Sequence, residues 1–435
     1  MSQTARVLVS ERPGSRATGL GAALQSHGCA VTNVAAADDV PFRAAQDLPD
    51  VVVLDGALPK ATRTRVAHAL RRDEGTRLIP MIVAGARDAG DVDGLDIALP
   101  RHFADSDLIA RVHAVRRLAV MRQELERRIA TAAKFGFSTF VDTDLAEGPS
   151  RLRLVAIAPS NDELALLRAT TNGHGSVEIV DTLDATGPLS RRDHDAAFLF
   201  AHADAEAALD ACERIRRVPT LFHFPLVLLA PPSAFKDPAE AYHRGASDLV
   251  TTPCEAEALR VRVRSLVRQE RFRDYLQNAY REGLGLTVMD GLTGLFRYGF
   301  AHEHLAAQIH DHGQTRQDLS VAVIRILDLN AINRTADYAT GDRVLRQVGA
   351  MIGRLIRAEY FAARISGATF GVAMPGTPIE AARAVCRRMA SVIANTDVGL
   401  GRPELDGLTV AVGCADARPG DSPADLFERA AATPI

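Results

Sequence analysis

The chain has 435 residues, of which 47% are hydrophobic and 24% are charged, and its formal net charge is −3. This length is enough for about three domains, each with its own core. The nearly balanced charge provides no basic field for nucleic acid or an anionic lipid surface, so we expect neither as a partner. Apolar runs are too short for insertion into a membrane, and the first residues lack a signal-peptide pattern. The five cysteines follow no metal-ligand spacing, so the sequence predicts a cytoplasmic protein with reduced thiols.

The first part of the chain alternates short strand patterns with helical stretches. The strand patterns lie at residues 6–9, 50–54, 79–85 and 96–100. This alternation predicts a parallel, doubly wound α/β sheet, in which functional residues gather at the carboxyl ends of the strands. From Ser106 to about Phe135, apolar residues recur every three or four positions, which predicts a long helix. We assign residues 1–135 to a first domain that ends in this helix.

The same order of patterns recurs in the next part of the chain. Its strand patterns lie at residues 152–158, 194–200, 224–230 and 247–253. An internal repeat of this kind indicates that one supersecondary plan is used twice. A second long helix is expected from Glu255 to about Tyr280. The second domain is therefore assigned to residues 150–283.

The third domain, residues 285–435, is centred on a predicted β-hairpin. Strand patterns at Phe361–Ile365 and Phe370–Met374 flank the small-residue sequence Ser-Gly-Ala-Thr, which suits a tight turn. Amphipathic helices are expected on either side of the hairpin, over residues 341–357 and 380–395.

With Gly367 and Phe370 in place, this hairpin resembles the Gly-Gly-Asp/Glu-Glu-Phe turn of the GGDEF domains of diguanylate cyclases. The sequence Asp-Gly-Leu-Thr-Gly-Leu that begins at Asp290 is similar to the entry of those domains. The first two domains resemble the receiver domains of response regulators, and the whole chain resembles the PleD-type response regulators. The predicted fold class is α/β, with two doubly wound, flavodoxin-like receiver domains followed by an α/β GGDEF domain of the nucleotide-cyclase type.

Asp55 follows the strand pattern at residues 50–54 and takes the place, at the end of the third strand, where receiver domains carry their phosphoryl acceptor. The residues around it depart from that family. The acidic pair reads Glu11-Arg12, the hydroxyl position falls at Ala84 or Gly85, and no lysine occurs in residues 98–100. An arginine cannot coordinate the hard cation that neutralises an incoming phosphoryl group. Asp55 is therefore either a phosphoacceptor or an ordinary acid at a strand end.

The second receiver-like domain has Phe200 at the acceptor position, so phosphorylation in the usual way is excluded there. We expect this domain to act in packing or dimerisation. The family resemblance implies a homodimer.

The acids that hold magnesium in diguanylate cyclases are replaced in this chain. Arg325 and Leu327 take the places of two acids on the first core strand, and Asp328 comes one residue late, on the other face. Ala368 and Thr369 replace the acids of the hairpin. Because the family joins two GTP molecules with magnesium held by carboxylates, these losses predict a catalytically inactive protein that needs no metal.

Two polar residues match the guanine-reading pair of the family. Asn333 and Asp342 have the donor and acceptor groups that suit a guanine edge, so the resemblance implies a guanine nucleotide site. Read from the residues alone, Asn333 is a polar loop residue and Asp342 is a helix N-cap. Both interpretations remain open at this point.

GGDEF domains also carry an R-x-x-D site that binds their product, cyclic di-GMP. The matching segment here is Arg357-Ala358-Glu359-Tyr360, and a second arginine from the following helix falls at Arg388. Guanidinium groups stack on guanine and bond to phosphate or to the Hoogsteen edge, which suits a stacked cyclic dinucleotide. The resemblance therefore implies cyclic di-GMP as the ligand, with Tyr360 in place of the usual aspartate.

These features together predict a cyclic di-GMP effector or scaffold that is not an enzyme. The resemblance implies that it recruits protein partners of bacterial cell-cycle control and regulated proteolysis, at the cell pole. The alternatives are a phosphorylation-dependent response regulator that acts through Asp55, and a GTP-binding pseudo-cyclase.

Overall fold

The computed structural model describes residues 5–435 except for gaps at 12–18, 87–95, 101–102, 104, 138–150, 172, 174, 181–183, 191–193, 202–203, 219–220, 222–223, 236–238, 284–287, 316 and 396–407, and it leaves the side chains of residues 100, 106 and 275–283 undescribed. The chain separates into two compact units. One covers Thr4–Ala119 and Asp142–Phe272, and the other covers Val120–Val141 and Arg273–Ile435. Each unit is considered by itself.

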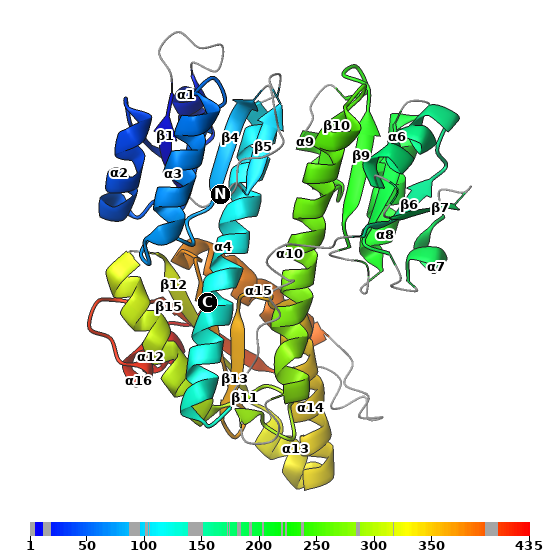
Figure 1. Ribbon diagram of the computed structural model, residues 1–435. Helices are drawn as coiled ribbons and strands as arrows, with labels where there is room; N and C mark the ends of the chain where they lie inside the picture. Colours follow the sequence, from blue (N-terminus) through cyan, green and yellow to red (C-terminus); the bar gives the residue numbers. More distant parts are fainter. Residues whose placement is uncertain are drawn as a thin grey trace. The chain divides into compact units, whose positions relative to one another are not determined.

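The first unit begins with a five-stranded parallel sheet in the order β2-β1-β3-β4-β5, which is the flavodoxin-like order (Figure 1). Alternate residues of a strand point to opposite faces, so each face has its own core. Helix α1 and the start of α4 cover one face, and α2 and α3 cover the other. The elements are β1 (Arg6–Ser10), α1 (Leu20–Ser26), β2 (Ala30–Asn33), α2 (Val40–Asp47), β3 (Val51–Asp55), α3 (Lys60–Arg72), β4 (Met81–Ala86), β5 (Ile97–Pro100) and α4 (Asp105–Lys134).

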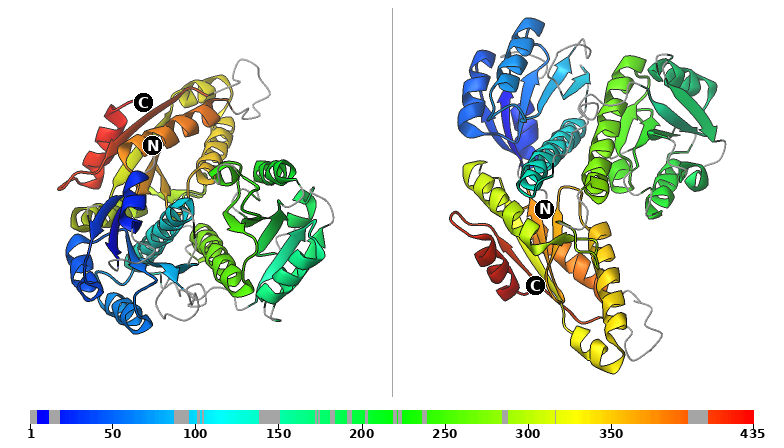
Figure 2. Two further views of the ribbon diagram at one scale, coloured as in Figure 1. Left: turned by 90° about the horizontal axis from the view of Figure 1, so that it is seen from above. Right: turned by 60° about the horizontal axis from the view of Figure 1, so that its bottom comes forward.

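A second parallel sheet of the same unit repeats this plan in the order β10-β9-β8-β6-β7. Helices α6 and α10 cover one face, and α7, α8 and α9 cover the other (Figure 2). The predicted pair of doubly wound sheets is confirmed. The elements are β6 (Arg153–Ile157), α6 (Asn161–Thr171), β7 (Ser176–Val180), α7 (Thr186–Leu189), β8 (Ala196–Phe200), α8 (Ala205–Arg217), β9 (Leu226–Ala230), α9 (Ala239–His243), β10 (Asp248–Thr251) and α10 (Ala256–Gly283).

A buried ion cluster joins the two sheets of this unit. Asp248 at the start of β10 is fully buried and accepts hydrogen bonds from Arg262 Nη2 at 2.8 Å and Nε at 3.0 Å. Arg111 of α4, 3% exposed, also pairs with this carboxylate. Burial raises the pKa of Asp248, but the two arginines lower it by more, so the pKa is about 2. A carboxylate held between two guanidinium groups ties the first receiver-like domain to the second.

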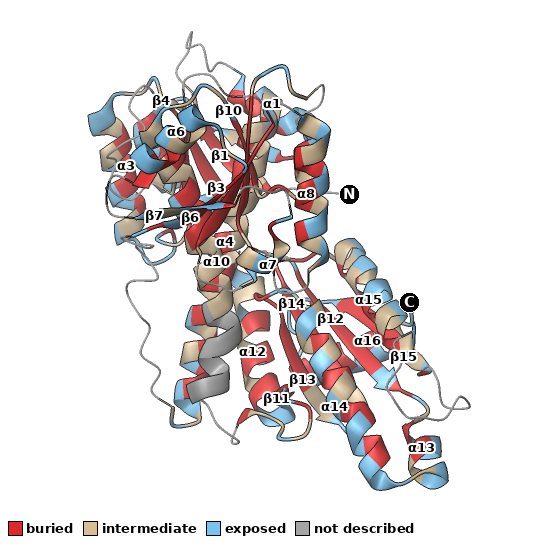
Figure 3. Cartoon of the chain, turned by 90° about the vertical axis from the view of Figure 1, so that its right-hand side faces the viewer, coloured by how far each residue is buried: buried red, intermediate tan, exposed pale blue. Residues whose placement is uncertain are grey.

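The other unit holds a mixed sheet in the order β11-β13-β14-β12-β15, with β12 antiparallel to both β14 and β15. Helices α13, α14 and α15 cover one face, and α12 and α16 cover the other, so the strands are mostly buried (Figure 3). The elements are β11 (Phe296–Arg297), α12 (Tyr298–Thr315), β12 (Leu319–Ile326), α13 (Leu329–Thr335), α14 (Tyr338–Leu355), β13 (Phe361–Ser366), β14 (Thr369–Pro375), α15 (Ile379–Asn395), β15 (Val410–Asp416) and α16 (Pro423–Ala432).

The predicted hairpin is confirmed. Strands β13 and β14 are antiparallel, and Ser366 pairs with Thr369 across a two-residue turn in which Gly367 has a positive φ of 39°. The helix before it starts earlier than predicted, at Tyr338, because Asp337 is its N-cap and accepts from Thr340 N at 2.7 Å. The interpretation of Asp342 as an N-cap is therefore wrong.

The long helices α4 and α10 lie within two or three residues of the predicted bounds. The second half of α4 packs with the C-terminal unit, where Ala132 joins its core. The three domain boundaries stay a prediction. No described helix has the length and apolar character needed to span a membrane.

Candidate functional site

The turn between α14 and β13 carries the first predicted ligand-binding arginine. It is closed by a hydrogen bond from Tyr360 N to Arg357 O at 3.0 Å. The Arg357 side chain is 51% exposed, and its guanidinium carbon lies 5.7 Å from the centroid of the Tyr360 ring, within the range of a cation–π contact. The turn therefore presents a guanidinium group to solvent above an aromatic ring.

The other two residues of this segment point inward. Glu359 and Tyr360 are each only 3% exposed. The Tyr360 hydroxyl lies 3.0 Å from Thr377 Oγ1, and Glu359 Oε1 lies 4.0 Å from Arg357 Nη1. The structure thus places the phenol in the core and the carboxylate beneath Arg357, away from the exposed surface.

Arg388 reaches the end of α14, close in sequence to Arg357. It is exposed on α15, and its Nη2 donates to the carbonyl oxygen of Leu355 at 3.2 Å. Leu355 is the last residue of α14 and stands two positions before Arg357. Both predicted arginines therefore lie near the carboxyl end of α14, a location we call the arginine corner (Arg357 and Arg388).

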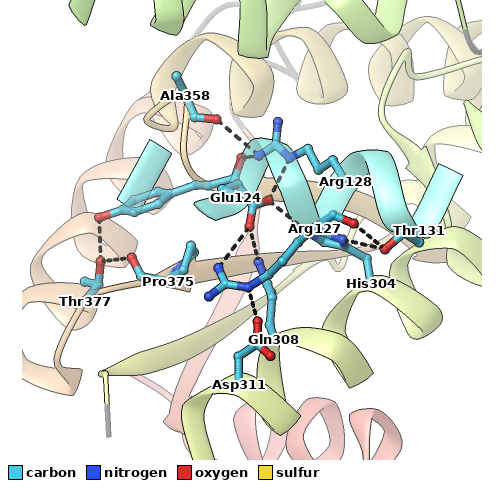
Figure 4. Close-up of polar contacts among 11 residues, drawn as sticks. Glu124, Arg127, Arg128, Thr131, His304, Gln308, Asp311, Ala358, Pro375 and Thr377 are labelled. Carbon is cyan, nitrogen blue, oxygen red and sulfur yellow. Dashed lines mark hydrogen bonds and ion pairs between the residues drawn. The ribbon is translucent and has the colours of Figure 1, made fainter. Parts of the chain in front are cut away.

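A buried arginine forms hydrogen bonds with the backbone of the turn between α14 and β13 (Figure 4). Arg128 of α4 is 3% exposed, and its Nη2 donates to the carbonyl oxygens of Ala358 at 3.1 Å and Tyr360 at 2.9 Å. Its Nε donates to Glu124 Oε1 at 2.7 Å. These contacts could not be predicted from sequence, because Arg128 and Ala358 are 230 positions apart.

Glu124 is the centre of this buried network. It is fully buried and lies 2.8 Å from His304 Nε2, and its Oε2 accepts from Gln308 Nε2 at 2.9 Å. Burial raises the pKa of Glu124, but His304 and Arg128 lower it, and the net result is a pKa well below the usual range. An ionised Glu124 can only accept, so the Nε2 of His304 carries the proton of their hydrogen bond.

The two predicted guanine-reading residues lie on neighbouring helices. Asn333 lies on α13, and its Oδ1 is buried without a hydrogen-bond partner among the described residues. A Cβ at Gly341 of α14 would lie only 1.9 Å from this oxygen, so a larger residue there would displace the Asn333 amide. Asp342 follows Gly341 and is exposed. The structure therefore places an acceptor without a described partner and an exposed carboxylate on adjoining helices, and the guanine interpretation stays a prediction.

The positions of the family's magnesium ligands carry other side chains. Arg325 is exposed near the end of β12 and pairs with Thr369 of the hairpin, and Leu327 is 51% exposed. Asp328 Oδ2 instead accepts from Thr409 N and fixes the start of β15. Among the residues that the structure describes, no group of three acids, histidines or cysteines could hold a metal. Hard cations take oxygen ligands, so these side chains do not fit magnesium.

Asp55 ends β3 and is 1% exposed, with its Oδ1 accepting from Ala57 N at 2.8 Å. The Glu11 carboxylate accepts from the backbone of Gly19 at 3.0 Å and of Gly21 at 2.5 Å, whereas Arg12 lies outside the described residues. In the second sheet, Phe200 is buried in the core. Asp55 thus keeps the place of a phosphoacceptor, and its role stays a prediction.

Comparison with known proteins matches the C-terminal part of the chain to a family model. The family model described as "Diguanylate cyclase, GGDEF domain" matches residues 287–433. Response regulator PleD of Caulobacter vibrioides is 28% identical over 403 residues, which cover 89% of this chain and 87% of PleD. The chain is similar to PleD over most of its length, and its C-terminal part matches the GGDEF domain model.

Other relatives match parts of this PleD-like chain. The diguanylate cyclase DgcP of Pseudomonas aeruginosa is 27% identical over 175 residues, or 40% of this chain and 25% of DgcP. Among solved structures, the GGDEF domain of DgcB from Caulobacter crescentus in complex with c-di-GMP is 27% identical, with a TM-score of 0.31, covering 34% of this chain and 86% of that one.

These comparisons correct one prediction. The replaced acids at Arg325, Leu327, Ala368 and Thr369 predict a protein that is not an enzyme. The matched family, however, is one of diguanylate cyclases, and the chain is similar to PleD over most of its length. The prediction of a non-enzyme is therefore wrong.

Proposed function

We propose that this PleD-like regulator binds cyclic di-GMP at the arginine corner. The observation that carries the proposal is that Arg388, 31 positions after Arg357 in the sequence, hydrogen-bonds to the carbonyl oxygen of Leu355, two positions before Arg357. Two exposed planar cations at one corner suit a ligand with two phosphates and two guanine bases.

The surroundings of the corner favour an anionic, aromatic ligand. Arg357 is already set above the Tyr360 ring, which limits the freedom that it loses when a guanine base stacks on it. Glu359, the acid beside it, is buried beneath the guanidinium group. Binding of this kind uses guanidinium groups and requires no metal ion.

The role of the bound state follows from the resemblance alone. We infer that the chain is a PopA-like effector, acting in the cytoplasm and at the cell pole as a scaffold for protein partners of cell-cycle control and regulated proteolysis. We also infer a homodimer, with domains bounded near residues 135 and 285.

The test is isothermal titration calorimetry of the full chain with cyclic di-GMP. A charge-assisted hydrogen bond contributes about 1.5–3 kcal/mol, so Arg357→Ala and Arg388→Ala should each weaken binding about tenfold or more. The matched control is Arg346→Ala, an exposed arginine in the middle of the same helix, α14. No binding by the wild type, or equal affinity in all variants, would refute the proposal.

A second candidate function is guanine nucleotide binding at Asn333 and Asp342. The buried, unpartnered Oδ1 of Asn333 favours it, because an unmet acceptor in the described structure can receive a hydrogen bond from the N1 or N2 group of guanine. Titration with GTP, and loss of the heat in Asn333→Ala, would support this role. Wild-type protein that gives no heat with GTP would exclude it.

A further inference from the structure

The hydrogen bonds of Arg128 connect helix α4 to the backbone of the arginine corner. One terminal nitrogen donates to both Ala358 O and Tyr360 O, at 3.1 and 2.9 Å. These two carbonyls lie on either side of Glu359, in the segment that begins with Arg357. The path of the chain immediately after Arg357 is thus fixed by a side chain from a distant part of the sequence.

The orientation of Arg128 is itself set by buried partners. Its Nε donates a hydrogen bond to Glu124, which lies one turn earlier on the same helix. Glu124 is also hydrogen-bonded to His304 and Gln308 of α12. Thr131, one turn in the other direction, lies 3.1 Å from His304 Nδ1. Buried polar groups without partners are costly, so this arrangement has few alternatives while α4 stays docked.

We propose that Arg128 is a positioning residue for cyclic di-GMP, so that docking of the second half of α4 and occupation of the arginine corner are coupled. This inference rests on the proposed function. If Arg128 is withdrawn, the carbonyls of Ala358 and Tyr360 lose a shared donor, and the turn that aims Arg357 is free to change. Coupling is reciprocal in equilibrium binding, so the ligand also stabilises the docked helix.

Arg127 provides a matched control on the same helix. Its Nε pairs with Asp311 Oδ2, and its Nη1 lies 3.8 Å from Glu124 Oε2, but none of its described hydrogen bonds reaches the turn. Removal of either arginine disturbs the buried network, whereas only Arg128 contacts Ala358 and Tyr360. A general loss of packing would therefore lower the stability of both variants, whereas a positioning effect would lower the affinity for cyclic di-GMP only in the Arg128 variants.

The experiment is calorimetric titration of the full chain with cyclic di-GMP for wild type, Arg128→Met, Arg128→Lys and Arg127→Met. Couplings of this kind typically change affinity about 5- to 150-fold, so we expect Arg128→Met to bind at least about fivefold more weakly and Arg127→Met to bind like wild type. Arg128→Lys keeps the charge beside Glu124 but lacks the planar fork that reaches two carbonyls, so its affinity falls while its thermal unfolding stays closer to wild type.

Hydrogen exchange provides a second readout. Added cyclic di-GMP should slow exchange of the amides of residues 124–131 in the wild type but not in Arg357→Ala, because the ligand has no direct contact with that helix in the proposal. If both Arg128 variants bind cyclic di-GMP with wild-type affinity, or if Arg127→Met weakens binding as much as Arg128→Met does, the coupling is overturned and the ligand site stays intact. Absence of wild-type binding overturns the ligand site itself.

Discussion

Replacement of Glu124 by glutamine should destabilise the C-terminal unit by about 3–5 kcal/mol, the usual cost of removing one partner of a buried ion pair. Glu124 is fully buried and is the acceptor for Arg128 Nε at 2.7 Å and His304 Nε2 at 2.8 Å. A glutamine of the same shape offers one oxygen, and its amide hydrogens would face the donors that the carboxylate now satisfies. This loss is a large part of the roughly 5–15 kcal/mol that stabilises a typical domain.

The chain has no tryptophan, so unfolding is best followed by circular dichroism in urea and by scanning calorimetry. Glu126→Gln is the control, because Glu126 is exposed on the same helix. The reasoning fails if the free energy of unfolding from every transition of Glu124→Gln lies within about 1 kcal/mol of the control value. That figure is the upper end of the usual contribution of a surface ion pair.

The same substitution has a pH signature. Burial raises the pKa of Glu124, but His304 and Arg128 lower it, so the folded value lies well below the ordinary value of 4.5. A group with a depressed folded pKa contributes stability that is complete above its unfolded pKa and is lost as the pH falls through the folded pKa. The difference in urea midpoint between wild type and Glu124→Gln should therefore shrink from about pH 7 to about pH 3. A constant difference would show that Glu124 is not held ionised.

Three further substitutions separate the sites of this chain. Tyr360→Phe removes the hydroxyl that contacts Thr377 and should cost about 0.5–1.5 kcal/mol in urea unfolding, with unchanged affinity for cyclic di-GMP; a loss of affinity would show that the phenol reaches the ligand. Gly341→Ala places a methyl group 1.9 Å from the present position of Asn333 Oδ1, so any heat of GTP binding should fall while cyclic di-GMP binding persists. Acetyl phosphate should add one phosphoryl group to the wild type and none to Asp55→Asn by intact mass; equal masses would remove Asp55 as an input.

Much of the architecture could be predicted because the central strands are buried on both faces. Strand β9 is apolar throughout and β3 is apolar up to Asp55, every residue of both is buried, and the spacing of such strands indicated a doubly wound sheet. The strands β2 and β7 were missed because they lie at sheet edges and are largely exposed, so they lack that apolar pattern. The start of α14 was misplaced because Asp342 is followed by the apolar periodic positions, whereas the first turn after the actual cap, Asp337, reads Tyr-Ala-Thr-Gly and lacks that periodicity.

The candidate site was predictable only where its residues are near one another or near the hairpin in sequence. Arg357 and Arg388 could be located by their distance from Gly367, and Arg388 contacts Leu355, two positions before Arg357. The inward direction of Tyr360 could not be predicted, because it depends on packing against a core assembled from distant helices. Glu124 and Arg128, four residues apart, have the spacing of an ordinary surface ion pair on a helix, and nothing in the sequence indicates that α12 and β13 bury them.

Helix α4 begins in the core of the first receiver-like domain and ends in the core of the C-terminal unit beside α12. A truncation anywhere along α4 therefore removes core residues from one of the two. A fragment started at residue 285 would contain the whole family match and still lack the carboxylate that faces His304 and Gln308. Binding constants measured on such a fragment would describe a protein whose α12 side lacks the second half of α4. Adding residues 120–137 as a separate peptide and repeating the titration would measure what that half-helix contributes to affinity.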